Sequence, residues 1–401
     1  MNGVAGRHVV LGVSGGIASY KACVVARRLT EAGATVDVVM TAAATEFVRP
    51  LVFEALTGRP VATSLWEAGR ALEHIRMGRE TDLIVVAPAT ARLIARAAQG
   101  MADDLLTSLL LARRAPLLLC PAMNDQMYAH PETGKNLAIL SERGVHVLGP
   151  VTGALARGEG EGPGRMVEPE EIVAHVERLL RSAAPFAGRR VLVTAGPTRE
   201  ALDPVRVVTN RSSGRMGFAL SRAAWLRGAE VTLVAGPTAL PVPIGPDVVR
   251  VESTADLRSV VCGLMPDADV LLMAAAPADF RPARAEGAKT PRREGARTLE
   301  LEPTDDVLAA VVPLRKAGAV VVGFALETGD AVPKAREKLR RKHLDLIVAN
   351  DASEPGAGPE VSTNRVTLVG ESDETALPLL GKDAVAEAIL DRVASLLLAR
   401  G

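Results

Sequence analysis

A glycine-rich turn follows the first apolar run of the chain, in the stretch GVSGGI. The run at residues 8–13 predicts a buried strand, and residues 15–33 predict a helix. Backbone N–H groups in such a turn, together with the positive end of the helix, favour a bound anion such as a phosphate. The turn lacks the GxGxxG spacing of dinucleotide sites, so a tight strand–helix joint is the alternative interpretation. Its residues are Ser14, Gly15, Gly16 and Ile17.

Small and polar residues also follow the next three predicted strands, at residues 35–40, 82–88 and 116–122. Ligands of open α/β sheets bind at the carboxyl ends of the strands. The order therefore predicts one shared crevice for the residues that come next, which are Thr41, Thr90 and Asn124. His74 precedes the third strand. Taken alone, a single histidine is more often structural than catalytic.

The C-terminal half carries a second set of polar residues. Residues 191–217 predict a strand, a long polar loop and the start of a helix, with Arg206, Asn210 and Arg211 near the helix entrance. Cations and an amide at this place suit a phosphate or a carboxylate, whereas composition alone favours a solvated loop. Small residues ahead of Asp279 let a flat group lie close to the backbone. Three lysines farther along are suited to neutralise a triphosphate, namely Lys289, Lys338 and Lys342.

Continuous Val/Ile/Leu runs that alternate with helical periods position these residues. Such runs are typical of parallel sheets covered on both faces. The second half repeats the pattern, since GATVDVV at 33–39 is echoed by GAEVTLV at 228–234. An amphipathic helix is predicted at 168–182, and the stretch 183–188 then interrupts the pattern. We therefore expect an α/β protein with two doubly wound, Rossmann-like domains, at residues 1–186 and 187–401.

Composition excludes several function classes. Lysine and arginine together number 47, equal to aspartate and glutamate. The chain therefore lacks the excess of basic residues that would indicate binding to nucleic acid. The three cysteines are widely spaced and predict neither a disulfide framework nor a zinc site. No apolar run reaches the roughly 18 residues that cross a bilayer, and Gly and Ser break the N-terminal run that resembles a signal peptide. We expect a soluble cytoplasmic protein.

The N-terminal half resembles the flavin-dependent cysteine decarboxylases, and most closely phosphopantothenoylcysteine decarboxylase. The likeness rests on ordered segments within about residues 8–166, namely GVSGGIASYK, VVMTAAATEFV, LEHIRMGRE, APATARLIA, GMADDLLTSLLLA and PAMN. The resemblance implies FMN, with its phosphate at the turn of residues 14–17 and its flavin near Thr41, Ala89 and Thr90. It implies that His74 is the catalytic histidine and that Asn124 binds the carboxylate of the substrate. Oxidation of the cysteine side chain by FMN would make CO2 leave readily, because a thioaldehyde accepts the electrons.

The stretch ARGEGEGPGRM at residues 156–166 aligns with the flap of that family, so we expect a lid rather than a linker. The family flap carries a cysteine, in a pattern like Ala-Cys-Gly, that donates the proton ending the cycle. Arginine stands there in this chain and is a poor proton donor. Cys120 is either a small buried hydrophobe or a substitute donor, and water is a third source. The flap residues are Arg157, Gly158, Gly164, Arg165 and Met166.

The C-terminal half resembles phosphopantothenate–cysteine ligase over about residues 189–369. The fused bacterial form implies CTP, an acyl-cytidylate intermediate and Mg²⁺ held through the nucleotide phosphates. Arg206 and Asn210 would act at the intermediate, and Lys289 at the transferring phosphate. Pro277 and the run 304–306 depart from the family pattern, and residues 353–360 look like a mobile loop. The implied CTP contacts are Met273, Ala274, Ala275, Asp279, Lys289, Asp305, Asp306, Val307, Leu308, Phe324, Lys338 and Lys342.

Together the two resemblances imply a bifunctional enzyme of coenzyme A biosynthesis, with a flavodoxin-like FMN-binding domain and a nucleotide-binding domain. The ligase would join 4'-phosphopantothenate to cysteine, and the decarboxylase would convert phosphopantothenoylcysteine to 4'-phosphopantetheine. One alternative keeps the ligase active beside an impaired or regulatory flavoprotein half, because the flap cysteine is absent. Others are a flavin prenyltransferase or a peptide-cysteine decarboxylase. The partners implied are small molecules and further copies of the chain, without nucleic acid or membrane.

Overall fold

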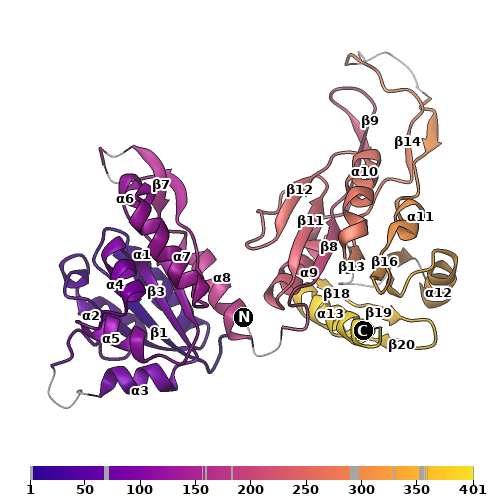
Figure 1. Cartoon of the computed structure of the whole chain (residues 1–401). Helices are drawn as coiled ribbons and strands as arrows, with labels where there is room; N and C mark the ends of the chain where they lie inside the picture. The colour runs from indigo at the N-terminus through magenta and orange to yellow at the C-terminus, as the bar shows by residue number, and fades with distance from the viewer. Residues whose placement is uncertain are drawn as a thin grey trace. The chain divides into compact units, whose positions relative to one another are not determined.

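A computed structural model gives the structure of the chain as two compact units, Met1–Ser182 and Ala183–Gly401 (Figure 1). The residues described are 3–66, 72–155, 157–158, 160–181, 184–289, 298–327, 329, 331–351, 356, 358 and 360–400. Each unit is described by itself.

The first unit contains a five-stranded parallel sheet in the order β2-β1-β3-β4-β5. This is the flavodoxin-like order, in which the chain reverses direction across the sheet between β1 and β3. Four of the strands coincide closely with the predicted apolar runs and are buried over most of their length. The predicted fold class is therefore confirmed for this half. The strands are β1 (His8–Val13), β2 (Thr35–Met40), β3 (Leu83–Ala89), β4 (Leu117–Pro121) and β5 (His146–Val147).

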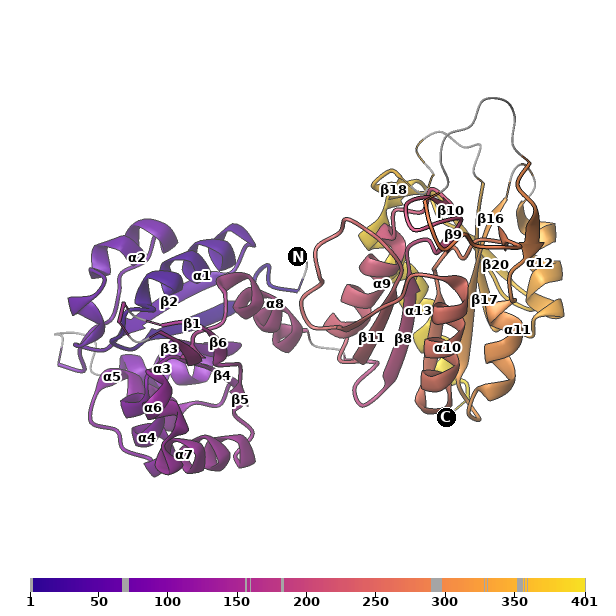
Figure 2. The ribbon, with the colours of Figure 1, turned by 90° about the horizontal axis from the view of Figure 1, so that it is seen from above.

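Helices cover both faces of this sheet, as Figure 2 shows. On one face lie α1 (Ser19–Glu31), α2 (Pro50–Thr57) and α8 (Pro169–Leu180), the last within the predicted span 168–182. Because strand side chains alternate between faces, β1, β2, β3 and β4 each contribute to both cores. The other face packs against α3 (Glu73–Glu80), α4 (Ala91–Gln99), α5 (Leu105–Ala112) and α7 (Pro131–Glu142).

A two-stranded hairpin stands at the carboxyl edge of this sheet. It consists of β6 (Val151–Ala154) and β7 (Glu161–Arg165), which pair antiparallel. The second half of the glycine-rich stretch 156–166 is thus a strand and not a loop, which corrects the sequence-based interpretation. Figure 1 shows β7 at the same end of the unit as α6 (Asp125–Ala129), which it contacts.

The second unit contains an eight-stranded sheet in the order β12-β11-β8-β13-β16-β17-β19-β20. Its first six strands are parallel and follow the dinucleotide-fold order 3-2-1-4-5-6, so the predicted Rossmann-like class is confirmed here too. The last two strands pair antiparallel. The strands are β8 (Arg190–Ala195), β11 (Glu230–Ala235), β12 (Asp247–Arg250), β13 (Val270–Met273), β16 (Val320–Glu327), β17 (Leu346–Asp351), β19 (Thr367–Val369) and β20 (Glu374–Ala376).

Helices also cover both faces of the second sheet. One face packs against α10 (Thr254–Leu264), α11 (Val307–Val311) and α12 (Ala331–Arg341). On the other face lie α9 (Arg215–Leu226) and α13 (Lys382–Leu398), which contact each other.

Three two-stranded antiparallel sheets complete the second unit. The polar segment predicted as one long loop contains a hairpin of β9 (Arg199–Ala201) and β10 (Val207–Thr209), which is a second correction. The other two sheets pair β14 (Phe280–Pro282) with β15 (Leu301–Pro303), and β18 (Thr363–Asn364) with β21 (Leu380–Gly381).

Phe53 anchors α2 to the first sheet, since it is fully buried while Leu51 on the same helix is 71% exposed. We expect Phe53→Ala to destabilise the first unit by about 3–5 kcal/mol, because it leaves a large cavity. Leu51→Ala should stay within about 0.5 kcal/mol. Urea-dependent hydrogen exchange of peptides from β1 and β2, read by mass spectrometry, measures both variants. Equal effects would contradict the burial pattern.

Candidate active sites

A cavity of about 1020 Å³ opens at the carboxyl edge of the first sheet. It is walled by the turns after β1 to β4 and by β7. The structure thus brings the predicted strand-end residues to one crevice. The predicted residues among its lining are Ser14, Gly15, Gly16, Ile17, Thr41, Thr90, Asn124, Gly164, Arg165 and Met166.

Ser14 fastens two turns of this cavity together. Its hydroxyl donates to the carbonyl oxygen of Pro88 at 2.8 Å and accepts from the backbone N–H of Thr90 at 3.0 Å. The side chain is almost completely buried. The buried hydroxyl of Ser19 closes the turn by donating to the carbonyl oxygen of Gly16 at 2.7 Å. The turn that precedes α1 is therefore held rigidly against the turn that follows β3.

Gly15 permits a close approach between the turns after β1 and β2. A Cβ at this position would lie 2.5 Å from the Cβ of Ala43 and 2.6 Å from its carbonyl carbon. No side chain fits there without a backbone shift. Gly16 has ordinary space around its own Cβ position, with Thr90 Cγ2 at 3.6 Å. The glycine pair thus forms a narrow cradle lined by backbone at the beginning of α1, as an anion site requires.

Asn124 presents an oriented amide to the cavity. It is the N-cap of α6, and its Oδ1 accepts from the N–H of Gln126 at 2.9 Å. Because the oxygen is used by the helix, the amide nitrogen is the group that Asn124 offers to a ligand. On the opposite wall the hydroxyl of Thr41 accepts from the N–H of Ala44 at 3.3 Å.

The base of the flap is fixed by backbone contacts. Gly164 has φ +138°, and its carbonyl oxygen accepts from the N–H of Met123 at 3.0 Å. A Cβ on Gly164 would lie 2.2 Å from the carbonyl oxygen of Met123. Of the flap tip, Arg157 and Gly158 are exposed and do not line the cavity. Residues 156 and 159 lie outside the described residues.

Lys21 is a cavity residue that the sequence reasoning missed. Although only 5% exposed, its ammonium donates to the carbonyl oxygen of Met166 at 2.9 Å and pairs with Glu168 at 3.0 Å. Glu168 also pairs with Arg165 at 2.6 Å. Burial raises the pKa of Glu168, but hydrogen bonds from Lys21 and Arg165 lower it overall. The signal in the sequence was a lysine on the apolar face of a helix just after the glycine turn.

Besides Arg157 and Gly158, three predicted residues lie outside the lining of this cavity. His74 is on α3, which packs against α5, and its buried Nδ1 has no hydrogen-bond partner among the described residues. Ala89 ends β3 and is buried, and its carbonyl oxygen accepts from the N–H of Ala122. Cys120 is fully buried in the core on β4, where burial raises the pKa of its thiol far above the usual range. The interpretation of Cys120 as a core residue is therefore supported.

In the second unit the loop after β13 lies against the end of β8. The buried hydroxyl of Thr194 accepts from the N–H of Ala275 at 2.9 Å, and Asn210 donates through Nδ2 to the carbonyl oxygen of Ala276. The Oδ1 of Asn210 accepts from the N–H of Ser212 at 3.0 Å. The structure thus joins Asn210 to the small-residue segment 273–276. Thr194 is a positioning residue that the sequence reasoning missed, since it reads there as part of a strand.

A second group of predicted residues meets between α11, α12 and β16. Lys338 donates to the carbonyl oxygen of Phe324 at 2.9 Å, and burial lowers the pKa of this lysine. Lys342 pairs with Asp306, which caps α11 by accepting from the N–H of Ala309 at 3.1 Å. Burial raises the pKa of Asp306, but Lys342 lowers it overall. Val307 and Leu308 on α11 are buried in the core.

The remaining predicted residues are placed separately. Arg206 forms a two-pronged ion pair with Asp203, with Nε at 2.9 Å from the carboxylate. Asp305 pairs with Arg258 at 3.5 Å. Asp279 accepts from the N–H of Thr304 through its carbonyl oxygen, and Lys289 is exposed. Most of the predicted loop 353–360 lies outside the described residues.

The described part of the chain has neither a membrane-spanning helix nor a metal-binding group of side chains. Within it, no helix is both long and apolar enough to cross a membrane. The same residues contain no group of three or more His, Cys, Asp or Glu side chains arranged to hold a metal ion.

Comparison with known proteins covers nearly the whole chain. The Flavoprotein family model matches residues 3–181, and the model of the DNA/pantothenate metabolism flavoprotein C-terminal domain matches residues 186–397. The coenzyme A biosynthesis bifunctional protein CoaBC of Vibrio cholerae is 47% identical over 394 residues, which is 97% of this chain and 98% of that protein. The protein of the same name from Mycobacterium tuberculosis is 48% identical over 406 residues, which is 98% of this chain and 97% of that protein. A crystal structure of the C-terminal domain of a CoaBC protein is 38% identical, covers 54% of this chain and all of that one, and has a TM-score of 0.47.

Gly164→Ala should detach β7 from the loop around Met123, because the added methyl group meets a backbone oxygen and the residue has a left-handed φ. We expect faster hydrogen exchange in residues 161–165 and 123–125. Gly134→Ala on α7 is the matched control, since nothing lies within 4 Å of the added methyl group. Unchanged exchange in Gly164→Ala would contradict the assigned contact.

Proposed function

The chain belongs to the family of coenzyme A biosynthesis bifunctional proteins CoaBC, and on that premise we propose which residues of its decarboxylase and its ligase carry each reaction. The enzyme is bifunctional, with a flavoprotein decarboxylase half and a ligase half. We place it in the cytoplasm, where its phosphorylated small-molecule substrates dissolve. The ligase makes phosphopantothenoylcysteine and the decarboxylase consumes it.

The N-terminal cavity suits FMN. The observation that carries this proposal is the cradle at Gly15 and Gly16, which a side chain would fill and which opens into a space of about 1020 Å³. Backbone N–H groups before α1 bind the phosphate there, while Thr41 and Thr90 border the ring system and Ala89 lies behind them in the core. FMN, when bound, supplies the hydride chemistry that oxidises the cysteine side chain and later reduces the product.

The side chains of this unit hold and enclose the substrate. The amide nitrogen of Asn124 donates to the substrate carboxylate and orients it until CO2 leaves. Strand β7 and Met166 cover the cavity, and Lys21 holds that cover against α1 through Met166 and Glu168. A closed cover excludes bulk solvent and strengthens each hydrogen bond to the substrate.

A second copy of the chain completes the decarboxylation site in this proposal. His74, the proposed proton-handling residue, does not line the cavity of its own chain. Exposed apolar side chains line that cavity, since Ile17 just before α1 is 64% exposed, Tyr20 on α1 58% and Met127 on α6 49%. Apolar patches of this kind mark interaction surfaces. Association of copies through this face covers the patch and brings His74 of another copy to the cavity.

The final proton comes from water rather than from a thiol. The flap has Arg157 in place of a cysteine, and Cys120 is buried in the core outside the cavity lining. The alternative of an impaired or regulatory flavoprotein half is not favoured, because relatives that match nearly the full chain are bifunctional proteins.

The ligase half binds CTP across the loop after β13 and the group between α11 and α12. The segment 273–275 packs against the base, and Lys338, Lys342 and Lys289 neutralise the triphosphate together with Mg²⁺ held through its phosphates. The carboxylate of phosphopantothenate attacks the α-phosphorus of CTP, releasing pyrophosphate. Asn210 and Arg206 hold the resulting acyl-cytidylate while the cysteine amine displaces CMP.

Anaerobic conversion of phosphopantothenoylcysteine tests the decarboxylase directly. We expect a product with the mass of 4'-phosphopantetheine, and the same product at the same rate from Cys120→Ser, because the buried thiol takes no part. A product two hydrogens lighter would show that the cycle stops at the enethiol. A slow Cys120→Ser variant of normal stability would make the thiol the donor.

Lys342→Gln tests the nucleotide group. We expect the KM for CTP to rise about tenfold or more, because one charge-assisted contact to phosphate is lost. Lys135→Gln on α7, in the other unit, is the control and should leave ligation unchanged.

Chelation of Mg²⁺ should abolish pyrophosphate release, and restored Mg²⁺ should restore it. Ligation that survives chelation would refute the assigned metal requirement.

A further inference from the structure

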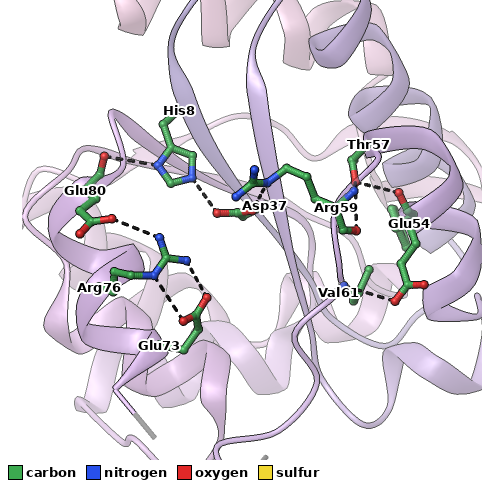
Figure 3. A network of polar contacts seen from close by, with 10 residues as sticks. His8, Asp37, Glu54, Thr57, Arg59, Val61, Glu73, Arg76 and Glu80 are labelled. Carbon is green, nitrogen blue, oxygen red and sulfur yellow. Dashed lines mark hydrogen bonds and ion pairs between the residues drawn. The ribbon is translucent and has the colours of Figure 1, made fainter. Parts of the chain in front are cut away.

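A buried ion cluster lies near the amino ends of β1 and β2. Figure 3 shows the ring of His8 between Asp37 and the last turn of α3. The Nε2 of His8 lies 2.8 Å from Oδ2 of Asp37, and its Nδ1 lies 3.3 Å from the carbonyl oxygen of Glu80. The other carboxylate oxygen of Asp37 accepts from Nε of Arg59 at 2.5 Å. Asp37 is only 3% exposed.

Both partners of the imidazole are hydrogen-bond acceptors. A neutral imidazole has one N–H and can satisfy only one of them, whereas an imidazolium donates from both nitrogens. The geometry therefore selects the protonated ring. The hydrogen bond to Asp37 correspondingly raises the pKa of His8, against the effects of burial and of Arg59. Burial raises the pKa of Asp37, but His8 and Arg59 lower it to about 2 overall.

The other charged groups around His8 form pairs of their own. Arg76 on α3 bridges Glu73 at 2.6 Å and Glu80 at 3.1 Å. Arg7 pairs with Asp82 at 3.1 Å, and the other oxygen of Asp82 accepts from the backbone N–H of His8 at 2.7 Å. The nearby cations thus have carboxylate partners, and His8 is the group whose charge changes near neutral pH.

The cluster fixes one end of α3. The carbonyl oxygen of Glu80 belongs to the last residue of this eight-residue helix, and His74 lies in its first turn. Two residues before Glu80, Gly78 packs closely against α5 and its carbonyl oxygen accepts from the N–H of Arg114 at 2.9 Å. Because so short a helix moves as a rigid rod of about 12 Å, a shift at Glu80 about the contact at Gly78 also shifts His74.

We propose that protonated His8 is a positioning residue for the decarboxylation: it fastens the end of α3 to buried Asp37 and so sets the place of His74. The inference rests on the proposed role of His74. The ion pair between His8 and Asp37 is fully formed below about pH 6.5, the ordinary pKa of histidine. It is lost as pH rises through the raised pKa of His8 in the folded protein. On the acid side Asp37 keeps its charge until pH falls towards about 2. Alkaline pH therefore releases α3 and slows decarboxylation, while ligation in the other unit is unaffected by this group.

Nitrogen-15 NMR of the histidine rings in the full-length holoenzyme tests the first step. At pH 7 we expect both nitrogens of His8 to carry protons, with a titration midpoint above the ordinary pKa of histidine, about 6.5. A neutral His8 ring at pH 7 would overturn the proposal whether or not the enzyme decarboxylates.

Two variants test the consequence. His8→Phe removes both donors, and His8→Arg keeps a permanent charge with several donors. In hydrogen exchange at matched pH, α3 should be less protected in His8→Phe than in the wild type, and the difference should shrink as pH rises. His8→Arg should retain protection at alkaline pH. Equal protection of α3 in all three proteins would overturn the proposal without reference to activity.

Kinetics complete the test, with ligation as the internal control for folding and His146→Phe as the matched histidine control. His8→Phe should lower kcat of decarboxylation about tenfold near pH 7 with little change in KM, since misplacement of a proton-handling group acts on the chemical step. It should also lose the alkaline decline that the wild type shows, and His8→Arg should restore activity there. A wild-type pH profile in His8→Phe would refute the positioning role while leaving the decarboxylase assignment intact. A wild type that does not decarboxylate would refute the assignment instead.

Discussion

The buried hydroxyl of Ser14 is the interaction on which the N-terminal site depends. It joins the turn after β1 to the turn after β3 at the place where the order of the strands reverses. Open α/β sheets leave a crevice at this point, because neighbouring loops run to opposite faces. Fastening the two turns across the crevice gives the glycine cradle a fixed shape. A preformed cradle binds an anion without first ordering its loop.

The second unit repeats this device with different residues. Thr194 is the last residue but one of the central strand β8, and its hydroxyl accepts from the N–H of Ala275 in the loop after neighbouring β13. Ser14 accepts from Thr90 in the loop after β3, which neighbours β1. In both units a buried hydroxyl thus joins two strand ends at the reversal point. Each such bond contributes about 1 kcal/mol to stability, but its larger effect is to fix two loops relative to each other.

The sequence predicted the strands well because strands buried on both faces read as continuous apolar runs. From them followed the crevice and several of its lining residues, since the carboxyl ends of parallel strands share one edge. Strand β7 was missed because its sequence, EGPGR, lacks both alternation and β-branched residues. The β9–β10 hairpin was missed because its strands have only three residues each.

The direction in which side chains point was harder to predict from the sequence. His74 was assigned to the cavity by resemblance, and the structure puts it on a helix outside the cavity lining. Lys21 was not singled out from the sequence, and it is buried because Glu168, far along the chain, supplies its counter-charge. Pairings between residues so distant in sequence depend on tertiary packing, and no local pattern reports them.

The central claim is that the turn at residues 14–17 binds the phosphate of FMN, and the affinities of the apoprotein for FMN and riboflavin test it most directly. The two ligands share the ring system and differ in the phosphate. The account predicts that FMN binds at least about 100-fold more tightly, since several backbone N–H groups donate to the phosphate. Equal affinities, measured by fluorescence quenching at the same ionic strength, would contradict it.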